Sequence, residues 1–474
     1  MEKNTVYLTT TLPYVNAEPH VGFASEIVRA DTLARYNRLM GKEVFFNTGT
    51  DEHGLKIYQK ATEAGKDAQQ YVDEYAEKFD RLKDALNLSY DNFIRTTDEA
   101  HKKAAQEFWK RCDASGDIYK KNYKVKYCVG CELEKTDSEL QQGKCSLHPS
   151  LEIEIIEEEN YFFKFSKYQE RLLTLYEEQP DFVIPSFRLN EIKVFVERGL
   201  EDFSISRLKS KMPWGVSVPD DDEQVMYVWF DALVNYISAI GWPDDMTTFE
   251  KWWPVVQLAG KDNLRQQSAM WQAMLISADL PPSKQVFIGG FINSDGQKMS
   301  KSTGNVINPF DIVHEYGTDA LRYYLLRHVH PFEDSDMTDE KFKEAYNANL
   351  ANGLGNLVAR VMKMAEEHLD SAPDIPTSSD FGTFKGYIEQ FEFQKAMDVI
   401  WERIGALDTK ITETAPFKLI KENPEEGKKL ITELVIELYT IGCILSPVLP
   451  DTNEKIKATI KANKMPVTLF PRKE

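Results

Sequence analysis

The sequence of 474 residues predicts an α/β protein whose parallel sheet is interrupted by an inserted module and followed by an all-helical region. Short apolar runs that resemble strands alternate with helical stretches over the first 115 residues. The same alternation returns after residue 228, and strand signals end at about residue 340. Alternation of this kind favours a parallel sheet with ligands at the carboxyl ends of its strands.

The first strand and helix enclose a tight turn. Residues 5–10 are β-branched and aromatic and predict a strand, and residues 24–40 repeat apolar side chains at helical spacing. Gly41 stands where a glycine commonly ends a helix. The turn between them reads PHVGFAS, residues 19–25. A strand, a turn and a helix N-terminus suit a phosphate site, because the first N–H groups of a helix have no partner within it.

The remaining elements follow the same pattern. We expect strands at 44–46, 227–230, 255–258 and 286–288, and helices at about 65–86 and 98–115. The acidic stretches 152–159 and 220–223 fall in the part that breaks the rhythm. We therefore expect four segments: 1–115, the first half of the α/β domain; 116–228, the insert; 229–340, its second half; and 341–474, a helical bundle.

Composition sets limits on the class of protein. The hydrophobic fraction of 42% and charged fraction of 28% are normal for a globular chain. No signal peptide and no apolar run near the roughly 20 residues of a membrane span is evident, so we expect a cytoplasmic protein without a membrane partner. Five cysteines are too few for a disulfide scaffold. The net charge of −19 argues against an overall basic coat, although a local nucleic-acid site stays compatible with it.

Three cysteines and a histidine predict a metal site. Cys128 and Cys131 form one C-x-x-C pair, and Cys145 and His148 form a second pair of ligands. Three thiolates and one imidazole suit tetrahedral Zn²⁺, and four protein ligands make the site structural. Surface cysteines spaced by chance are the alternative.

A second motif is the loop Lys298-Met299-Ser300-Lys301-Ser302. Two lysines three residues apart make a cationic loop that suits negative charge on transferring phosphates. Taken alone, such a loop is usually a solvated surface. Together with His20 and Gly22 in the turn, it resembles the paired motifs of the class I aminoacyl-tRNA synthetases.

The finer pattern resembles the methionyl-tRNA synthetase family over essentially the whole chain. The similar blocks, in order, are residues 10–16 (TTLPYVN), 49–54 (GTDEHG), 227–232 (YVWFDA), 260–262 (GKD), 356–360 (NLVAR) and 415–417 (APF). The resemblance implies a Rossmann-type catalytic domain with a zinc-containing insert and an anticodon-binding helical bundle. It also implies that L-methionine and ATP, with Mg²⁺, form methionyl-adenylate, and that the methionyl group then passes to tRNA(Met) with release of AMP.

The family pattern implies roles for individual residues. By this resemblance the catalytic residues are His20, Lys298 and Lys301, with Lys301 the stronger candidate for stabilising the transition state. ATP would be bound by His20, Gly22, Gly260, Asp262, Ile288, Lys298 and Lys301. Methionine would be bound by Asp51 at its ammonium group and otherwise by Leu12, Tyr14, Trp229, Leu233, Tyr236, Asn263 and Gln267. Ordinary core packing is the alternative for the aromatic residues among them.

The helical region would read tRNA. Asn356 and Arg360 lie four residues apart on one helix face, and Phe417 offers a ring for stacking on an unpaired base. The alternative is structural, with Phe417 packed in the bundle and Arg360 in a salt bridge. The insert is too short for a large editing domain, and no dimerisation module is appended, so we expect a monomer.

Four positions depart from the family pattern: Phe23 and Gln267 replace histidines, Asn263 an isoleucine, and Phe417 a tryptophan. Two other hypotheses stay open on the sequence. One is a class I synthetase for another amino acid, such as cysteine, which would be expected to have metal ligands in its pocket. The other is a non-catalytic tRNA-binding paralogue, which would bind tRNA without forming an adenylate.

Overall fold

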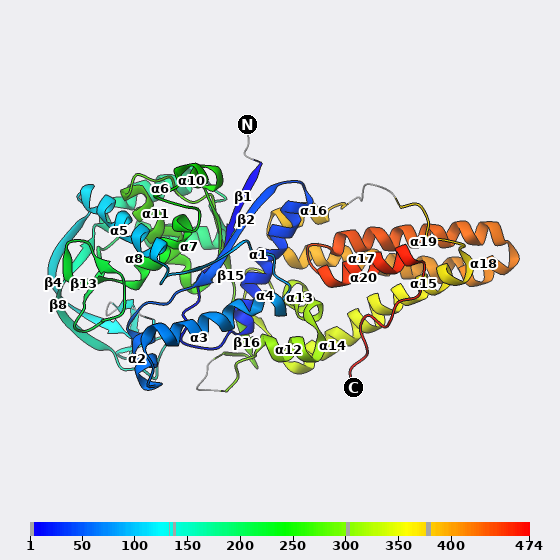
Figure 1. Cartoon of the computed structure of the whole chain (residues 1–474), viewed down its shortest axis with the longest axis horizontal. Coiled ribbons are helices and arrows are strands. Elements are labelled where there is room, and N and C mark those ends of the chain that lie inside the picture. Colours follow the sequence, from blue (N-terminus) through cyan, green and yellow to red (C-terminus); the bar gives the residue numbers. More distant parts are fainter. Residues whose placement is uncertain (1–3, 132, 136–138, 300–303, 376–380) are drawn as a thin grey trace. The chain divides into compact units, whose positions relative to one another are not determined.

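The computed structural model describes residues 4–131, 133–135, 139–299, 304–375 and 381–474 (Figure 1). The chain divides into two compact units. The first, which we call the sheet unit, comprises Met1–Glu18, Val44–Arg81 and Tyr90–Ile288. The second, the helical unit, comprises Pro19–Glu43, Leu82–Ser89 and Gly289–Glu474. The four segments expected from the sequence are a finer division, and their boundaries stay predictions.

A six-stranded sheet forms the core of the sheet unit. In spatial order its strands are β3 (Asn92–Arg95), β2 (Glu43–Thr50), β1 (Thr5–Thr9), β14 (Val256–Gly260), β15 (Gln285–Gly289) and β9 (Val183–Ile184). The pairs β2–β3, β1–β14 and β15–β9 are parallel. This confirms the parallel sheet, and non-consecutive neighbours such as β1 and β14 show that the insert and its flanking elements interrupt it.

The sheet unit also contains helices, most of which lie on one side of these strands in the view of Figure 1. They are α2 (Leu55–Glu63), α3 (Ala68–Asp80), α5 (Glu99–Ala114), α6 (Gln169–Glu178), α7 (Ser186–Glu197), α8 (Val228–Leu233), α9 (Asn235–Ser238), α10 (Met246–Trp252) and α11 (Trp271–Ser277). Aromatic side chains fill the space between several of them. The ring of Phe108 on α5 lies 5.7 Å from that of Phe230, 5.9 Å from Trp242 and 5.4 Å from Trp271, measured between centroids. The core therefore joins α5, α8 and α11.

One expected strand is wrong. Of residues 227–230, Tyr227 is the extended N-cap of α8 and Val228–Phe230 are helical, because strand β13 (Asp221–Met226) ends at Met226 and α8 begins at Val228. Residues 227–230 are almost entirely buried. When every residue of a short apolar segment is buried, its sequence shows no alternation of apolar and polar residues that would distinguish a strand from a helix. Tertiary contacts decide the conformation, above all the buried bonds of Asp231 described below.

The insert is mainly antiparallel. Its sheets are β10 (Phe203–Ser204), β8 (Glu154–Phe163), β4 (Ile118–Cys128) and β5 (Leu133–Lys135), in that order, and β11 (Ser206–Leu208), β13 and β12 (Ser217–Val218). The hairpin β6 (Leu140–Gln141) and β7 (Lys144–Cys145) is separate. The acidic run at 152–159 falls largely in β8, opposite the lysines of β4. Lys124 pairs with Glu157 at 3.0 Å, so the charges lie on a solvated face of this ribbon.

The helical unit begins with α1 (Val21–Leu39), which starts earlier than expected and is followed by Gly41 at φ +78°. The other helices are α4 (Leu82–Ala85), α12 (Pro309–Tyr316), α13 (Thr318–Arg327), α14 (Asp339–Ala345), α15 (Asn356–His368), α16 (Phe384–Glu389), α17 (Phe393–Thr414), α18 (Pro416–Glu422), α19 (Pro424–Leu445) and α20 (Pro450–Ala462). A small sheet of β17 (Gln297–Lys298), β16 (Ile292–Ser294) and β18 (Ser335–Asp336) precedes most of them.

The long helices α15, α17, α19 and α20 run beside one another as a bundle (Figure 1). Their facing sides are apolar, with Ile431, Leu434 and Leu438 of α19 fully buried. Past residue 340 the described residues contain no strand, as expected. None of the helices that the structure describes has the length and apolar run that a membrane crossing needs.

Candidate functional site

In the sheet unit, Asp51 lies directly after β2 and beside the segment that follows β1. Its backbone N–H donates to the carbonyl of Pro13 at 3.0 Å, and Tyr14 and Asp51 form an isolated parallel bridge. The Asp51 side chain is only 3% exposed. The rings of Tyr14 and Trp229 meet edge to face, with centroids 6.2 Å apart. The structure thus brings Asp51, Tyr14 and Trp229 of the predicted methionine pocket together.

Glu52, the next residue, is fully buried and held in place by charge. Arg95 donates from Nε to Glu52 Oε1 at 2.7 Å and from Nη2 to Oε2 at 2.9 Å. The hydroxyl groups of Thr50 and Thr97 also donate to this carboxylate. A bidentate guanidinium and two hydroxyl groups satisfy the buried charge, so the backbone beside Asp51 is firmly fixed.

His53, two residues after Asp51, belongs to a second buried cluster. Its Nδ1 lies 2.6 Å from Asp231 Oδ2, and Nε2 of His101 lies 2.8 Å from Oδ1 of the same carboxylate. Burial alone would raise the pKa of Asp231, but the two imidazoles outweigh it and hold the pKa at about 2. The carboxylate is therefore ionised at neutral pH and only accepts, so both facing imidazole nitrogens carry protons.

The predicted pocket residues Tyr236 and Gln267 form a second group. Gln267 Nε2 donates to the Tyr236 hydroxyl at 2.8 Å, and Gln267 Oε1 accepts from Gln257 Nε2 at 2.8 Å. Gln257 Oε1 in turn accepts from the Ser283 hydroxyl at 2.6 Å. Gln267 lies in the π-helical turn Gln266–Met270, a rare geometry that often marks functional sites. Its amide orientation is thus fixed by a chain of hydrogen bonds.

The other predicted residues of the sheet unit lie on or next to elements of its central sheet and core. Leu12 follows β1, Leu233 ends α8, Gly260 ends β14, Asp262 and Asn263 form part of the 3₁₀ turn Lys261–Asn263, and Ile288 lies in β15. Asn263 Nδ2 donates to Asp262 Oδ1 at 3.3 Å. Leu233 and Ile288 are buried, whereas Asp262 is exposed. Because β1 and β14 are parallel neighbours, Leu12 and Gly260 follow the same edge of the sheet.

In the helical unit, His20 is the N-cap of α1. Its backbone is extended, and its Nδ1 accepts from the N–H of Gly22 at 3.0 Å. Burial, aided by the charge of Lys298, lowers the pKa of His20 below its ordinary value. The imidazole is therefore neutral at physiological pH, with its proton on Nε2. A Cβ atom at Gly22 would lie 2.7 Å from His20 Cε1, so glycine is required for this cap.

Lys298 lies close to the same helix end. It belongs to β17, whose hairpin with β16 turns through Asp295 and Gly296, both at positive φ, in the Asp-Gly pattern of a tight hairpin. Its Nζ lies 4.9 Å from the centre of the Phe291 ring. Met299 Cε would be 3.8 Å from a Cβ at Gly22. The histidine turn and the start of the lysine motif thus meet within this unit, whereas Lys301 lies outside the described residues.

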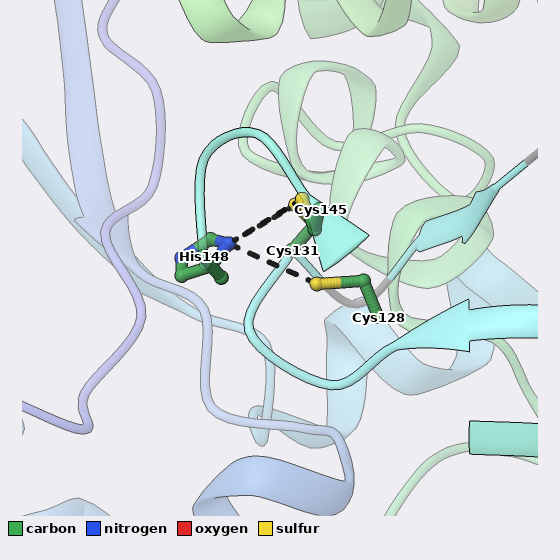
Figure 2. Close-up of side chains that lie close together, drawn as sticks. All are labelled: Cys128, Cys131, Cys145 and His148. Atoms are coloured by element: carbon green, nitrogen blue, oxygen red, sulfur yellow. Dashed lines mark hydrogen bonds between the residues drawn. The ribbon is translucent and has the colours of Figure 1, made fainter. Parts of the chain in front are cut away.

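The four predicted metal ligands converge in the insert (Figure 2). Cys131 Sγ lies 3.3 Å from Cys145 Sγ and 3.2 Å from His148 Nδ1, and Nδ1 is 3.8 Å from Cys128 Sγ. Donors at the corners of a tetrahedron around Zn²⁺, with Zn–S bonds of about 2.3 Å, are about 3.8 Å apart. All four ligand atoms lie within 4.8 Å of one another, so the cluster fits a metal ion of this size.

The three predicted anticodon residues are at the surface of the helical unit. Asn356 begins α15, Arg360 follows one turn later, and Phe417 lies in the first turn of α18. Arg360 forms an ion pair with Asp408, as the structural alternative expected, but both side chains are about half exposed. Phe417 is 50% exposed, so the alternative of a ring packed in the bundle is wrong.

Sequence reasoning missed the buried charges around Asp51. Glu52 and His53 follow Asp51 directly in the block GTDEHG. Two more polar residues immediately after a buried strand were the sequence signal that could have indicated them. Asp231 stands in the block YVWFDA, in which the sequence pattern gave a role only to Trp229. Arg95 and His101 carry no local signal, since only the tertiary fold brings them to Glu52 and Asp231.

Comparison with known proteins agrees with this geometry. A family model described as tRNA synthetases class I (M) matches residues 6–150 and 133–362. A methionine–tRNA ligase of Thermotoga maritima is 42% identical in an alignment 480 positions long that covers 97% of this chain and 76% of the relative. One from a Nostoc species is 40% identical, over 96% of this chain and 89% of the relative.

Solved structures are also similar. The Mycobacterium tuberculosis methionyl-tRNA synthetase in complex with methionyl-adenylate is 35% identical, with a TM-score of 0.90 and 99% of each chain covered. The apo form of that synthetase has a TM-score of 0.84 at 32% identity, over 100% of this chain and 99% of the other. On these matches, the chain belongs to the methionyl-tRNA synthetase family of the class I tRNA synthetases.

Proposed function

We propose that this protein activates L-methionine with ATP to form methionyl-adenylate and pyrophosphate, and then transfers the methionyl group to tRNA(Met). The observation that carries the proposal is the arrangement of Asp51, Tyr14 and Trp229. The side chain of Asp51 is buried, its backbone forms a β-bridge with Tyr14, and the Tyr14 ring packs against the Trp229 indole. A carboxylate suits the substrate ammonium, and aromatic walls suit a soft thioether. Neither the reaction nor the site requires a protein nucleophile.

Within the pocket, Asp51 binds the ammonium group of methionine. Leu12, Tyr14, Trp229, Leu233 and Tyr236 enclose the side chain, with Asn263 and Gln267 at its polar edge. Gln267 is supported in this role by its bond to the Tyr236 hydroxyl, which aligns both groups. An amide cannot change its charge, so the polar edge of the pocket stays neutral at all physiological pH values.

ATP is held mainly by charge and by the helix end. His20 presents its Nε2–H to the phosphates, because Nδ1 is occupied by the N–H of Gly22. A neutral donor at a helix N-terminus suits an anion without requiring a proton from solution. Lys298 and Lys301 balance the charge that develops on the α-phosphate and the leaving pyrophosphate. Gly260 and Asp262 bind the ribose, and the backbone near Ile288 lies by the adenine. Mg²⁺ enters with ATP.

The cysteine–histidine cluster of the insert holds Zn²⁺. Three thiol groups and one imidazole are ligands that Zn²⁺ prefers, and the distances between their sulfur and nitrogen atoms fit the corners of a tetrahedron. All four ligands come from the protein, so the ion stabilises the insert. Among the described residues, the cluster that could hold a metal ion includes no member of the methionine pocket, which disfavours a cysteine-type pocket with a metal in it.

Asn356, Arg360 and Phe417 contact the anticodon. Their exposure supports this role, since an Asn, an Arg and an aromatic ring at the surface suit unpaired bases. The Arg360 ion pair with Asp408 is exposed and costs little to break. The protein acts as a cytoplasmic monomer, without a membrane partner.

Exchange of labelled pyrophosphate into ATP tests the proposal. Purified protein with Mg²⁺ should catalyse this exchange only when L-methionine is added, and should then charge tRNA(Met). An Asp51→Asn variant should lose methionine-dependent exchange by about 10²-fold or more, since the charge-assisted contact is lost. Absence of exchange in the wild type would refute the catalytic role, and tRNA binding without exchange would favour a non-catalytic paralogue.

A further inference from the structure

Asp231 connects several elements of the sheet unit through one buried carboxylate. His53 belongs to the loop between β2 and α2, and His101 belongs to α5. Asp231 itself lies on α8. All three side chains are at most 3% exposed. A single side chain therefore joins three segments that are far apart in the sequence.

Two of the joined segments, the His53 loop and α8, carry parts of the predicted methionine pocket, and α5 contacts a third element that does. Asp51 lies two residues before His53, and Trp229 lies two residues before Asp231. The second nitrogen of His101 extends the cluster, because its Nδ1 lies 3.0 Å from the Ser238 hydroxyl of α9. Tyr236 is on that same short helix. Asp51, Trp229 and Tyr236 of the predicted pocket are thus each two residues from a residue of this hydrogen-bonded cluster.

We propose that Asp231 is a positioning residue for methionine: by binding His53 and His101 in the core, it holds the Asp51 loop and helices α8 and α9 at a fixed spacing. This inference rests on the proposed function of the same pocket. Asp231 itself makes no contact with the substrate. Its effect is to keep the carboxylate of Asp51 and the ring of Trp229 in the arrangement that the free amino acid fits.

The alternative is that the cluster only stabilises the core. Asp117 provides a matched comparison, since it is another fully buried carboxylate of the sheet unit. It binds Lys167 at 2.6 Å, the Ser277 hydroxyl at 2.9 Å and the hydroxyl of Tyr168. None of these partners is a predicted pocket residue. Asp117→Asn therefore removes a comparable buried charge without touching the elements that carry the pocket.

Steady-state pyrophosphate exchange with the full-length protein tests the proposal. Asp231→Asn should raise the KM for methionine about tenfold, with the KM for ATP and the rate at saturating methionine within threefold of wild type. A loosened pocket binds the amino acid less well, while the phosphate-binding groups are unchanged. Asp117→Asn should lower the melting temperature but leave the KM for methionine within twofold.

A second pair of variants covers the case in which Asp231→Asn does not fold. His53→Leu removes one donor while His101 still satisfies Asp231, and it should also raise the KM for methionine about tenfold. His53→Asn places an amide N–H near the position of Nδ1 and should restore the KM to within threefold of wild type.

The possible outcomes distinguish a failure of the positioning role of Asp231 from a failure of the proposed function. The KM increase in Asp231→Asn or His53→Leu, with recovery in His53→Asn, supports positioning. Folded variants with an unchanged KM for methionine, or an equal increase in Asp117→Asn, would overturn it while leaving the proposed function intact. A wild-type protein without methionine-dependent exchange would instead overturn the proposed function.

Discussion

Gly22 offers the sharpest test of how the histidine turn works. A glycine in such a turn is commonly read as room for a ligand to approach the backbone. The structure gives a different reason, since a Cβ at Gly22 would meet His20 itself, at 2.7 Å from Cε1 and 2.8 Å from Nδ1. Ordinary van der Waals contact begins near 3.4 Å. In a Gly22→Ala variant the imidazole must therefore move by roughly 0.7 Å or leave the cap.

The expected magnitude follows from that displacement. Misplacing a catalytic group by about 1 Å costs about 10²-fold in rate, and losing one donor to developing charge costs about 10²–10³-fold. Gly22→Ala should thus lower the rate of methionine-dependent exchange about 10²-fold, with little change in the KM for methionine. Loss of the cap bond should also lower the free energy of unfolding by about 1 kcal/mol.

A double-variant comparison identifies the cause. If Gly22 acts through His20, the His20→Ala/Gly22→Ala protein should be no slower than His20→Ala alone. If Gly22 instead makes room for ATP, the double variant should be slower by a further factor of ten or more. Gly405→Ala is the control, because a Cβ at this position in α17 meets nothing within 4 Å. It should stabilise the fold by about 0.5–1 kcal/mol without changing exchange. Wild-type exchange in Gly22→Ala would refute the reasoning.

Three further predictions concern other parts of the molecule. The pKa of Asp231 is about 2, below its ordinary 3.8, so its contacts stabilise the fold above pH 4 and weaken as the pH falls from about 4 to 2. Asp231→Asn should therefore lower the free energy of unfolding in urea by about 2 kcal/mol at pH 7, and a gap of the same size at pH 2 would contradict this. Cys128→Ser should lose bound zinc, measured by atomic absorption, and a full equivalent retained as tightly as in wild type would exclude the site. Arg360→Ala should raise the KM for tRNA about tenfold with exchange unchanged, whereas Asp408→Ala should not; equal effects would indicate a purely structural ion pair.

Local sequence was sufficient for the features that depend on neighbouring residues. The four metal ligands fall into two close pairs, so their convergence in one insert needed only short loops. The first helix and its closing glycine followed from periodicity and from the left-handed backbone that Gly41 adopts. The parallel sheet followed from the alternation of strands and helices, which leaves few other ways to bury both faces.

Tertiary structure decided everything that depends on partners distant in the chain. Residues 227–230 have a sequence compatible with a strand, but Val228–Phe230 belong to α8, a largely buried helix in which Asp231 bonds to two distant histidines. A buried charge requires partners in three dimensions, and no periodicity records which residues supply them. The sequence by itself predicted which groups would do the chemistry under the proposed function, whereas only the fold showed which buried groups lie beside them.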